Sequence, residues 1–433
     1  MIQALRIRAA LWGGGFAALF RLIALGVPAA FRKGGLAALL AASSGQRLVF
    51  AVLRAFKPNL RLKLRVITAY ENTGTAIITR HSDVTEVLER EADFAVVYEP
   101  RMRAITGGDN FFLGMQDSPA YERDVSLMRL IVRREDVATR LIPFVAREAA
   151  AIVAGCGGRL DVPAELTGPV PARILADYFG TPGSSEAEMI RWTTWMFWYL
   201  FADLKADENV GIPALGYAGD CRAWLDAAIA ARRVEPTPAD DILNRCLAMP
   251  GLDDLTIRNN LIGLMIGLVP TLSKASVLAL NQLFEQPEAL AMAQAAARQG
   301  DDALLGACIF EALRFDPANP IIYRRAVRDV VIARGHWRAL RIPEGTMVLA
   351  ANLSAMFDPF ALDAPETFRT DRPWGNYMLW GYGMHSCFGG HINHAVIPQM
   401  LKPLLQREGL RRVSAVDGAG SPFPAHFRVE FEP

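Results

Sequence analysis

The segment from Trp380 to Gly389, W-G-Y-G-M-H-S-C-F-G, constrains this chain more than any other feature. It is a glycine-rich loop that ends at Cys387 and is followed by an apolar run, Ala395–Leu405, that predicts a helix. Such a loop can hold a thiolate still, screen it from water and aim backbone N–H groups at its sulfur. A haem iron bound through cysteine requires this setting, because the sulfur pushes electron density towards O–O cleavage. The alternative is a small buried hydrophobic cysteine.

Residues around the cysteine favour the ligand over the buried thiol. Gly381, Gly383 and Gly389 permit backbone conformations closed to other residues, and they allow close approach to a flat ligand. His385, two residues before the cysteine, can present a ring nitrogen to an anionic group such as a haem propionate. We therefore interpret the loop as a cofactor-binding segment.

The segment resembles the haem-binding loop of the cytochrome P450 family, usually F-G-x-G-x-H-x-C-x-G, with Trp380 in place of the leading Phe. The resemblance implies haem b (heme b, iron protoporphyrin IX) with Cys387 as its axial ligand. It also implies that Phe388 and Gly389 direct N–H groups towards the sulfur and that Trp380 packs against the loop. Over roughly residues 60 to 430 it implies the cytochrome P450 fold, mainly α with a small β portion.

Composition agrees with a globular protein, since 52% of the 433 residues are hydrophobic and 21% are charged. The five cysteines are widely spaced and form no C-x-x-C pair, which argues against a disulfide framework or a zinc site. Reduced thiols indicate a cytoplasmic protein. We expect no nucleic-acid partner.

Residues 1–65 form a basic, apolar arm that holds eleven Lys or Arg and no Asp or Glu. Its longest apolar stretch, Ala9–Phe31, is interrupted by Arg21 and Pro28, which makes a membrane-spanning helix costly. One interpretation is an amphipathic arm at the anionic inner face of a membrane. The other is a set of ordinary helices docked on the body. We accordingly divide the chain into this arm and a catalytic domain, residues 66–433.

Helical periodicity dominates the catalytic domain. Val66–Arg80 predicts two short strands around an Asn-Thr-Gly turn, and His81-Ser82-Asp83 predicts the cap of a helix beginning near Val84. Strands are also expected at Tyr323–Ile332 and Thr346–Ala350. The other expected helices are Tyr121–Arg133, Leu141–Ala154, Ala172–Tyr178, Ser185–Leu204, Tyr217–Arg233, Ala239–Ala248, Leu255–Phe284 and Ala303–Arg314.

Glu311 and Arg314 stand three residues apart on the last of these helices, so they can pair. An exposed pair of this kind contributes less than about 1 kcal/mol. The segment E-A-L-R-F-D-P, however, resembles the E-x-x-R helix of the family, where the pair is buried and joined by a further arginine. Arg372 is our candidate for that third member, although Thr367 occupies the position of the arginine in many relatives.

Haem propionates need cations. By the family pattern, Arg324 in an R-x-A segment and His385 supply two of them. A third is expected from the helix at Tyr121–Arg133, where Arg129 matches the pattern and Arg123 is the competing candidate. Each can instead be an ordinary solvated arginine.

The longest predicted helix is apolar nearly all round from Leu261 to Val269, as expected for a helix in the middle of a core. The family carries A/G-G-x-D/E-T-T/S here, and the matching residues are G-L-V-P-T-L, with Thr271 conforming and Pro270 in place of the acid. The usual acid and alcohol relay protons through water. Proline instead removes an N–H and leaves the carbonyl of Ile266 without its donor. That carbonyl and Thr271 can hold a water, or Pro270 is a packing kink.

The resemblance implies a monooxygenase that inserts one atom of O2 into a lipophilic small molecule. No flavin or iron–sulfur segment is evident, so electrons are expected from a separate ferredoxin or reductase. One alternative, favoured by Pro270, is a peroxide-dependent or rearranging haem-thiolate enzyme. Another is a non-catalytic haem-binding protein. The residues expected to line the substrate pocket are Met265, Ile266, Gly267, Ile321 and Ile322.

Overall fold

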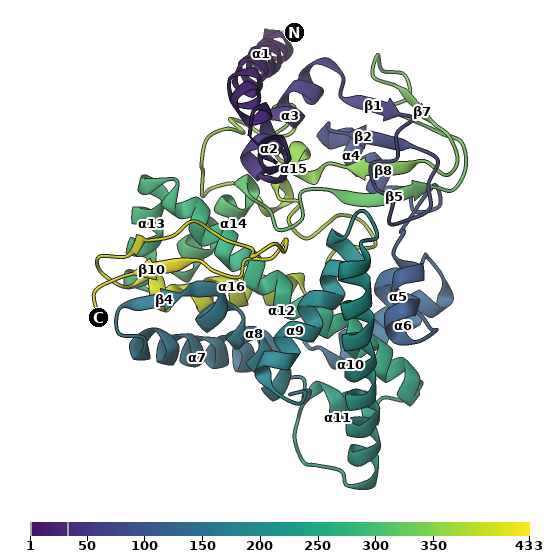
Figure 1. Cartoon of the computed structure of the whole chain (residues 1–433), viewed down its shortest axis with the longest axis vertical. Coiled ribbons are helices and arrows are strands. Elements are labelled where there is room, and N and C mark those ends of the chain that lie inside the picture. Colours follow the sequence, from purple (N-terminus) through teal and green to yellow (C-terminus); the bar gives the residue numbers. More distant parts are fainter. Residues whose placement is uncertain (1, 33) are drawn as a thin grey trace. The chain divides into compact units, whose positions relative to one another are not determined.

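The computed structural model describes residues 2–32 and 34–433, which form two compact units. The first unit comprises Met1–Val97 and Phe310–Cys387, and the second comprises Tyr98–Ile309 and Phe388–Pro433. Each unit is therefore built from two stretches that are far apart in the sequence (Figure 1).

The first unit contains a five-stranded sheet in the order β1-β2-β8-β5-β3. Strands β2 and β8 are parallel, and the other neighbouring pairs are antiparallel. A separate hairpin pairs β6 with β7. The strands are β1 Asn59–Leu62, β2 Thr75–Ile78, β3 Phe94–Ala95, β5 Ile322–Ala326, β6 Val330–Ile332, β7 Leu340–Ile342 and β8 Met347–Ala350.

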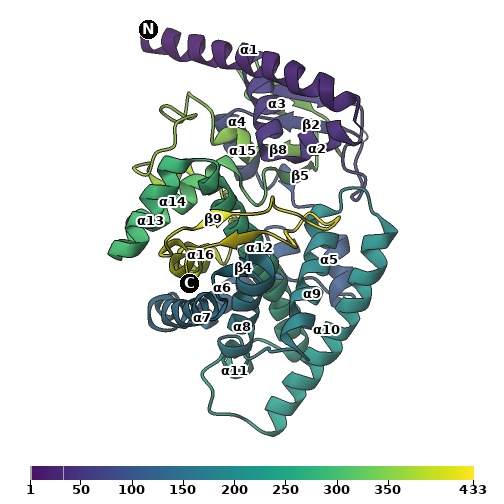
Figure 2. The ribbon, with the colours of Figure 1, turned by 60° about the vertical axis from the view of Figure 1, so that its left-hand side comes forward.

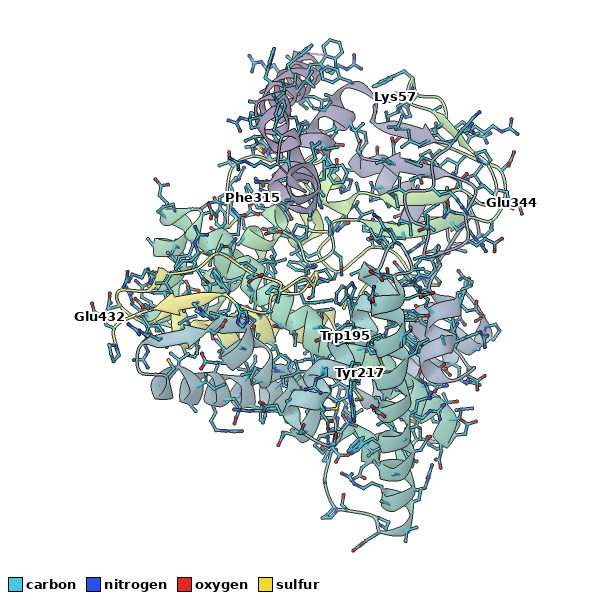
Figure 3. The ribbon with its side chains drawn as sticks, in the orientation of Figure 1. Lys57, Trp195, Tyr217, Phe315, Glu344 and Glu432 are labelled. Carbon is cyan, nitrogen blue, oxygen red and sulfur yellow. The ribbon has the colours of Figure 1, made fainter. Side chains whose placement is uncertain are left out.

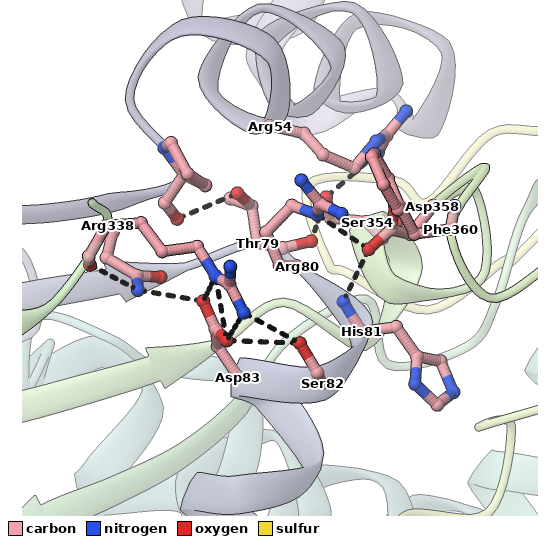
Figure 4. A network of polar contacts seen from close by, with 12 residues as sticks. Arg54, Thr79, Arg80, His81, Ser82, Asp83, Arg338, Ser354, Asp358 and Phe360 are labelled. Atoms are coloured by element: carbon pink, nitrogen blue, oxygen red, sulfur yellow. Dashed lines mark hydrogen bonds and ion pairs between the residues drawn. The ribbon is translucent and has the colours of Figure 1, made fainter. Parts of the chain in front are cut away.

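Helices cover this sheet and share its apolar core, which includes Ile78, Val87, Val348 and Phe357. A polar network lies beside the core (Figure 4), where Arg80 bonds Asp358 at 2.8 Å. The helices of this unit are α1 Ile2–Ala30, α2 Gly35–Ala41, α3 Ser43–Phe56, α4 His81–Glu89, α15 Asn352–Ala355 and the 3-10 turn η5 Trp374–Asn376. Helix α14, Asp302–Phe315, crosses the boundary between the two units.

The second unit is a helical body around α12, Asp254–Phe284, with a small antiparallel sheet in the order β4-β10-β9 (Figure 2). Helix α12 contacts α8, α9, α10 and α16. Trp195 of α9 and Tyr217 of α10 lie side by side, with ring centroids 6.1 Å apart (Figure 3). The other helices are α5 Glu99–Thr106, α6 Pro119–Ile131, α7 Ile142–Gly155, α8 Pro169–Asp177, α9 Glu186–Phe197, α10 Glu208–Val234, α11 Ile242–Ala248, α13 Pro287–Gln299 and α16 Gly390–Leu405. The remaining elements are η1 Phe112–Gly114, η2 Val137–Leu141, η3 Val162–Thr167, η4 Trp198–Ala202, β4 Arg159–Asp161, β9 Arg411–Arg412 and β10 Arg428–Glu430.

The prediction of a mainly α fold with a small β portion is confirmed. Two local predictions were wrong. The partner of β2 is β1, which precedes Val66, because Asn59–Leu62 pairs antiparallel with Thr75–Ile78. Helix α4 begins at His81, and the Asp83 carboxylate does not cap it but accepts from Arg338 at 2.7 Å.

Among the described residues, Arg6–Ala30 and Asp254–Phe284 are long and apolar enough to cross a membrane. Their surroundings differ, since 72% of the apolar window of the second helix is buried against only 17% of the first. Helix α12 is thus a core helix, and α1 is mostly exposed.

Candidate active site

The cysteine loop joins η5 to α16 and closes on itself. The backbone N–H of Cys387 donates to the carbonyl of Trp380 at 2.6 Å. Gly381 and Gly383 have φ of +81° and +74°, a left-handed conformation that glycine adopts without strain. A Cβ on Gly383 would lie 2.5 Å from the carbonyl oxygen of Leu88 in α4, so only glycine fits there.

Two glutamates near the end of α4 hold the loop in place. The N–H of Met384 donates to Glu91 Oε1 at 3.2 Å. A hydrogen bond to Glu89 raises the pKa of Tyr382. The loop is therefore bonded to α4 on both sides of Gly383, a support that the sequence pattern did not reveal.

Cys387 differs from the other cysteines in its exposure. Cys387 is exposed, whereas Cys221, Cys246 and Cys308 are buried. Burial raises the pKa of each of these three thiols to about 12. Among these four cysteines, only the loop cysteine is accessible to a ligand from outside the protein core.

Glu311 lies at the centre of a buried network next to the loop. Arg314 donates to it from Nε at 2.9 Å and from Nη2 at 2.7 Å, and both side chains are 0% exposed. Arg372 Nε donates to the same carboxylate at 3.1 Å. The Arg369 N–H and the Tyr377 hydroxyl complete the set at 3.0 Å each. The expected third member, Arg372, is thus in contact with the pair.

Burial alone would raise the pKa of Glu311. The hydrogen bonds from Arg314, from the Arg369 backbone and from Arg372, together with the charge of Arg314, outweigh that effect and hold the pKa below its ordinary value. Thr367, in the position noted from the sequence, contributes through its backbone, because its carbonyl accepts from both arginines. Tyr377 connects this network to Trp380, three residues further along the chain.

Phe388 and Gly389 begin the part of the loop that belongs to the second unit. The Phe388 ring packs on Phe112 with centroids 5.2 Å apart. Gly389 is the N-cap of α16. Within the described residues there is no group of three or more His, Cys, Asp or Glu that could hold a metal ion, so His391 and His394 form no such cluster.

Gly267 and Thr271 lie on a half-buried stripe of α12 that also includes Leu264 and Lys274. A Cβ on Gly267 would meet no heavy atom within 4 Å, so the backbone there borders open space that can accept a flat ligand. The Thr271 hydroxyl donates to the carbonyls of Gly267 and Leu268. Pro270 is buried within a continuous helix.

The structure places the other expected pocket residues differently. Met265 and Ile266 are 0% and 1% exposed, so they are core residues and Leu264 occupies the open stripe instead. Ile321 and Ile322 are partly buried and pack against the core of the first unit.

The expected propionate ligands have distinct surroundings. Arg324 is buried in β5, and its Nη1 donates to the Tyr323 carbonyl at 2.9 Å. His385 is half-buried in the loop. Arg123 pairs with Asp124 at 2.7 Å.

Arg129 lies close enough to His391, four residues after Cys387, to act on it electrostatically. Burial lowers the pKa of His391, and the charges of Arg134 and Arg129 lower it further. Both arginines therefore lie near the start of α16.

Comparison with known proteins agrees with this geometry. Residues 224–407 match the family model for cytochrome P450. The chain is 27% identical over 361 residues to mycinamicin IV hydroxylase/epoxidase of Micromonospora griseorubida, covering 76% of this chain and 81% of that protein. A stretch of 88 residues, 20% of this chain, is 36% identical to linoleate diol synthase of Gaeumannomyces graminis, of which it covers 8%.

Among solved structures, cytochrome P450 CYP109Q5 from Chondromyces apiculatus superposes with a TM-score of 0.72 at 24% identity, covering 89% of this chain and 95% of that one. The fold is that of solved cytochrome P450 structures, and the cysteine loop has the sequence pattern expected of a haem-binding loop. The resemblance to the cytochrome P450 family is confirmed in sequence and in fold. The chain is an oxidoreductase with haem b as its cofactor, and its residues 224–407 resemble the cytochrome P450 family.

Proposed function

We propose that this protein is a monooxygenase that inserts one atom of O2 into a lipophilic small molecule. The observation that carries the proposal is the exposed Cys387 on a loop next to the buried Glu311 network, in a chain with the cytochrome P450 fold. Relatives named hydroxylase/epoxidase and epoxidase support the same reaction class.

In this proposal the thiolate of Cys387 would hold the haem iron, and Phe388 and Gly389 would direct backbone N–H groups towards its sulfur. Arg324, His385 and Arg129 compensate the propionate charges. Bound haem supplies the redox centre at which O2 reacts. The Glu311 network, through Tyr377, holds the loop so that the thiolate keeps its orientation.

On α12, the departure at Pro270 limits how protons are delivered. The proline side chain has no acidic proton, and the Thr271 hydroxyl already donates its hydrogen bond to the carbonyl of Gly267. The Ile266 carbonyl lacks its i+4 N–H donor because residue 270 is a proline. We infer that a water held by this carbonyl and the Thr271 oxygen would relay a proton received from solvent. Pro270 is also the observation that favours the second candidate, a peroxide-dependent or rearranging enzyme of the same fold.

A cavity in the second unit supports a lipophilic substrate with an acidic group. It has a volume of about 340 Å³ and lies beside Pro270, with Trp195 and Phe423 among its walls. Its charged lining residues are Arg191 and Lys274, and its lining includes no carboxylate. Lys274 Nζ lies 5.6 Å from the centre of the Phe423 ring. A carboxylate or phosphate on an apolar body would match such walls.

Electrons would come from a separate ferredoxin or reductase. We also propose that residues 1–65, which hold eleven basic residues and no acid, contact the anionic inner face of a membrane.

The test compares two ways of driving turnover on a panel of lipophilic carboxylic acids and neutral analogues. The monooxygenase proposal expects product with NAD(P)H, a reductase and a ferredoxin. Product with hydrogen peroxide alone would instead support the second candidate. Pro270→Glu should raise reductant-driven turnover if the missing acid limits proton delivery. Pro213→Glu, at another proline inside a helix, is the matched control and should change nothing.

A further inference from the structure

Helix α1 packs on α3 through its smallest side chains. Among the residues of α1 whose burial is described, 6–30, the buried ones are Leu11, Gly15 and Ala18, and they recur at the helical spacing of one narrow face. A Cβ on Gly15 would lie 2.4 Å from Cβ of Ala55, so the two helices approach too closely for any other residue. Figure 2 shows α1 lying across α3.

Four large apolar side chains of α1 lie outside this contact. Trp12, Phe20, Ile23 and Val27 are 56%, 70%, 53% and 55% exposed, and we call these four residues the apolar ridge. Phe16 instead packs on Phe56 of α3, with ring centroids 4.9 Å apart. A helix docked on a water-soluble body normally buries its largest apolar residues and exposes its polar ones. In α1 the large apolar side chains are exposed and the small ones are buried. Exposed apolar patches of this kind mark surfaces that bind another protein or a membrane.

The charges on α1 fit a lipid surface. At 100° per residue, Arg21 lies between the ridge and the face that contacts α3, and Arg6 lies at the border of the ridge. Arginines at this level reach lipid headgroups while the neighbouring apolar side chains enter the acyl layer. Because residues 1–65 hold no acid, the surface that they match is anionic.

Helix α3 fixes this ridge to the unit that carries Cys387. Arg54 Nη1 donates to the Ser354 carbonyl at 3.0 Å and to its hydroxyl at 2.9 Å, and Arg54 is 4% exposed. The guanidinium of Arg47 lies 5.0 Å from the centre of the Phe315 ring. The ridge is therefore packed against the first unit through α3 and does not extend away from it.

We propose that α1 lies flat in the headgroup region of an anionic bilayer, with the apolar ridge inserted and the first unit held in a set orientation. This rests on the membrane contact of residues 1–65 proposed above and specifies its surface, partner and geometry. A spanning helix does not fit, because it would leave the contact with α3 and carry Arg21 into the acyl layer.

The experiment measures co-sedimentation of the haem-loaded protein with vesicles of phosphatidylcholine, with or without phosphatidylglycerol. We expect binding to the anionic vesicles that weakens with added salt. The triple variant Trp12→Ser, Phe20→Ser, Ile23→Ser should weaken it at least about 100-fold, since each side chain buries enough apolar area for about a tenfold effect. Trp337→Ser, at a tryptophan of the same unit that is more exposed than Trp12 (70% against 56%), should leave binding unchanged.

Three results would overturn this proposal: no binding to anionic vesicles, equal binding of the triple variant, or a ridge-dependent dimer that forms in the absence of lipid. Resistance to alkaline carbonate extraction would contradict the flat geometry and indicate a spanning helix. The carbon monoxide spectrum of every variant is recorded as well. A normal carbon monoxide spectrum without vesicle binding would refute the membrane proposal alone and would leave the proposed haem-thiolate function intact.

Discussion

Replacing Glu311 with glutamine tests whether the buried network holds the cysteine loop. The carboxylate accepts from Arg314 twice, from Arg372, from Tyr377 and from the backbone of Arg369. Glutamine keeps the shape of the side chain but removes its negative charge. It also replaces one acceptor oxygen by an NH2 donor, which would face the N–H and O–H donors of these residues. Arg314, which is 0% exposed, would then be a buried cation without a counter-charge.

Breaking one side of a buried ion pair costs about 3–5 kcal/mol. We therefore expect Glu311→Gln to lose about this much free energy of unfolding, measured by urea titration of the haem-free protein. Because the total stability of a domain is about 5–15 kcal/mol, the variant should also retain less haem per protein, measured from its visible absorbance. Asp371→Asn is the control, since this carboxylate pairs with Arg369 in the same segment but is exposed. If Glu311→Gln is no less stable than Asp371→Asn, the reasoning about the network is wrong.

The other predictions concern charge, cations and thiols. The pKa of Glu311 is lowered in the folded state, so its ionised carboxylate contributes fully to stability above the ordinary glutamate pKa. That contribution is lost as pH falls through the lower pKa of the folded state. The free energy of unfolding should therefore fall more steeply with acid in the wild type than in Glu311→Gln. Arg129→Ala should weaken haem retention measured by transfer to apomyoglobin, whereas Arg123→Ala should not, because Arg123 pairs with Asp124. In haem-free protein at pH 8, iodoacetamide should label Cys387 far faster than Cys221, whose buried thiol has its pKa raised to about 12. Added haem should protect Cys387, and labelling that haem does not slow would contradict its role as ligand.

Much of the candidate site could be predicted because its motifs are local. The glycine spacing around Cys387 reports backbone conformations directly, and Gly381 and Gly383 do adopt positive φ. The pair Glu311 and Arg314 follows from helical spacing, and the structure brings the two side chains together.

What the sequence could not show depends on tertiary packing. Helix α12 is apolar nearly all round, so its pattern does not indicate which face borders open space, and Met265 and Ile266 are core residues while Leu264 lies on the open stripe. The hydrogen bond from Met384 to Glu91 joins segments that are 293 residues apart. The same limit explains why β1 was missed, because its pairing with β2 depends on a sheet that also contains strands far away in the sequence.

The central claim is that the thiolate of Cys387 binds haem iron. The most direct measurement is the difference spectrum of the reduced, haem-loaded protein with carbon monoxide. We predict a Soret band shifted strongly to the red in the wild type, and its loss in Cys387→His. An unshifted band in the wild type, or the same shifted band in Cys387→His, would contradict the account.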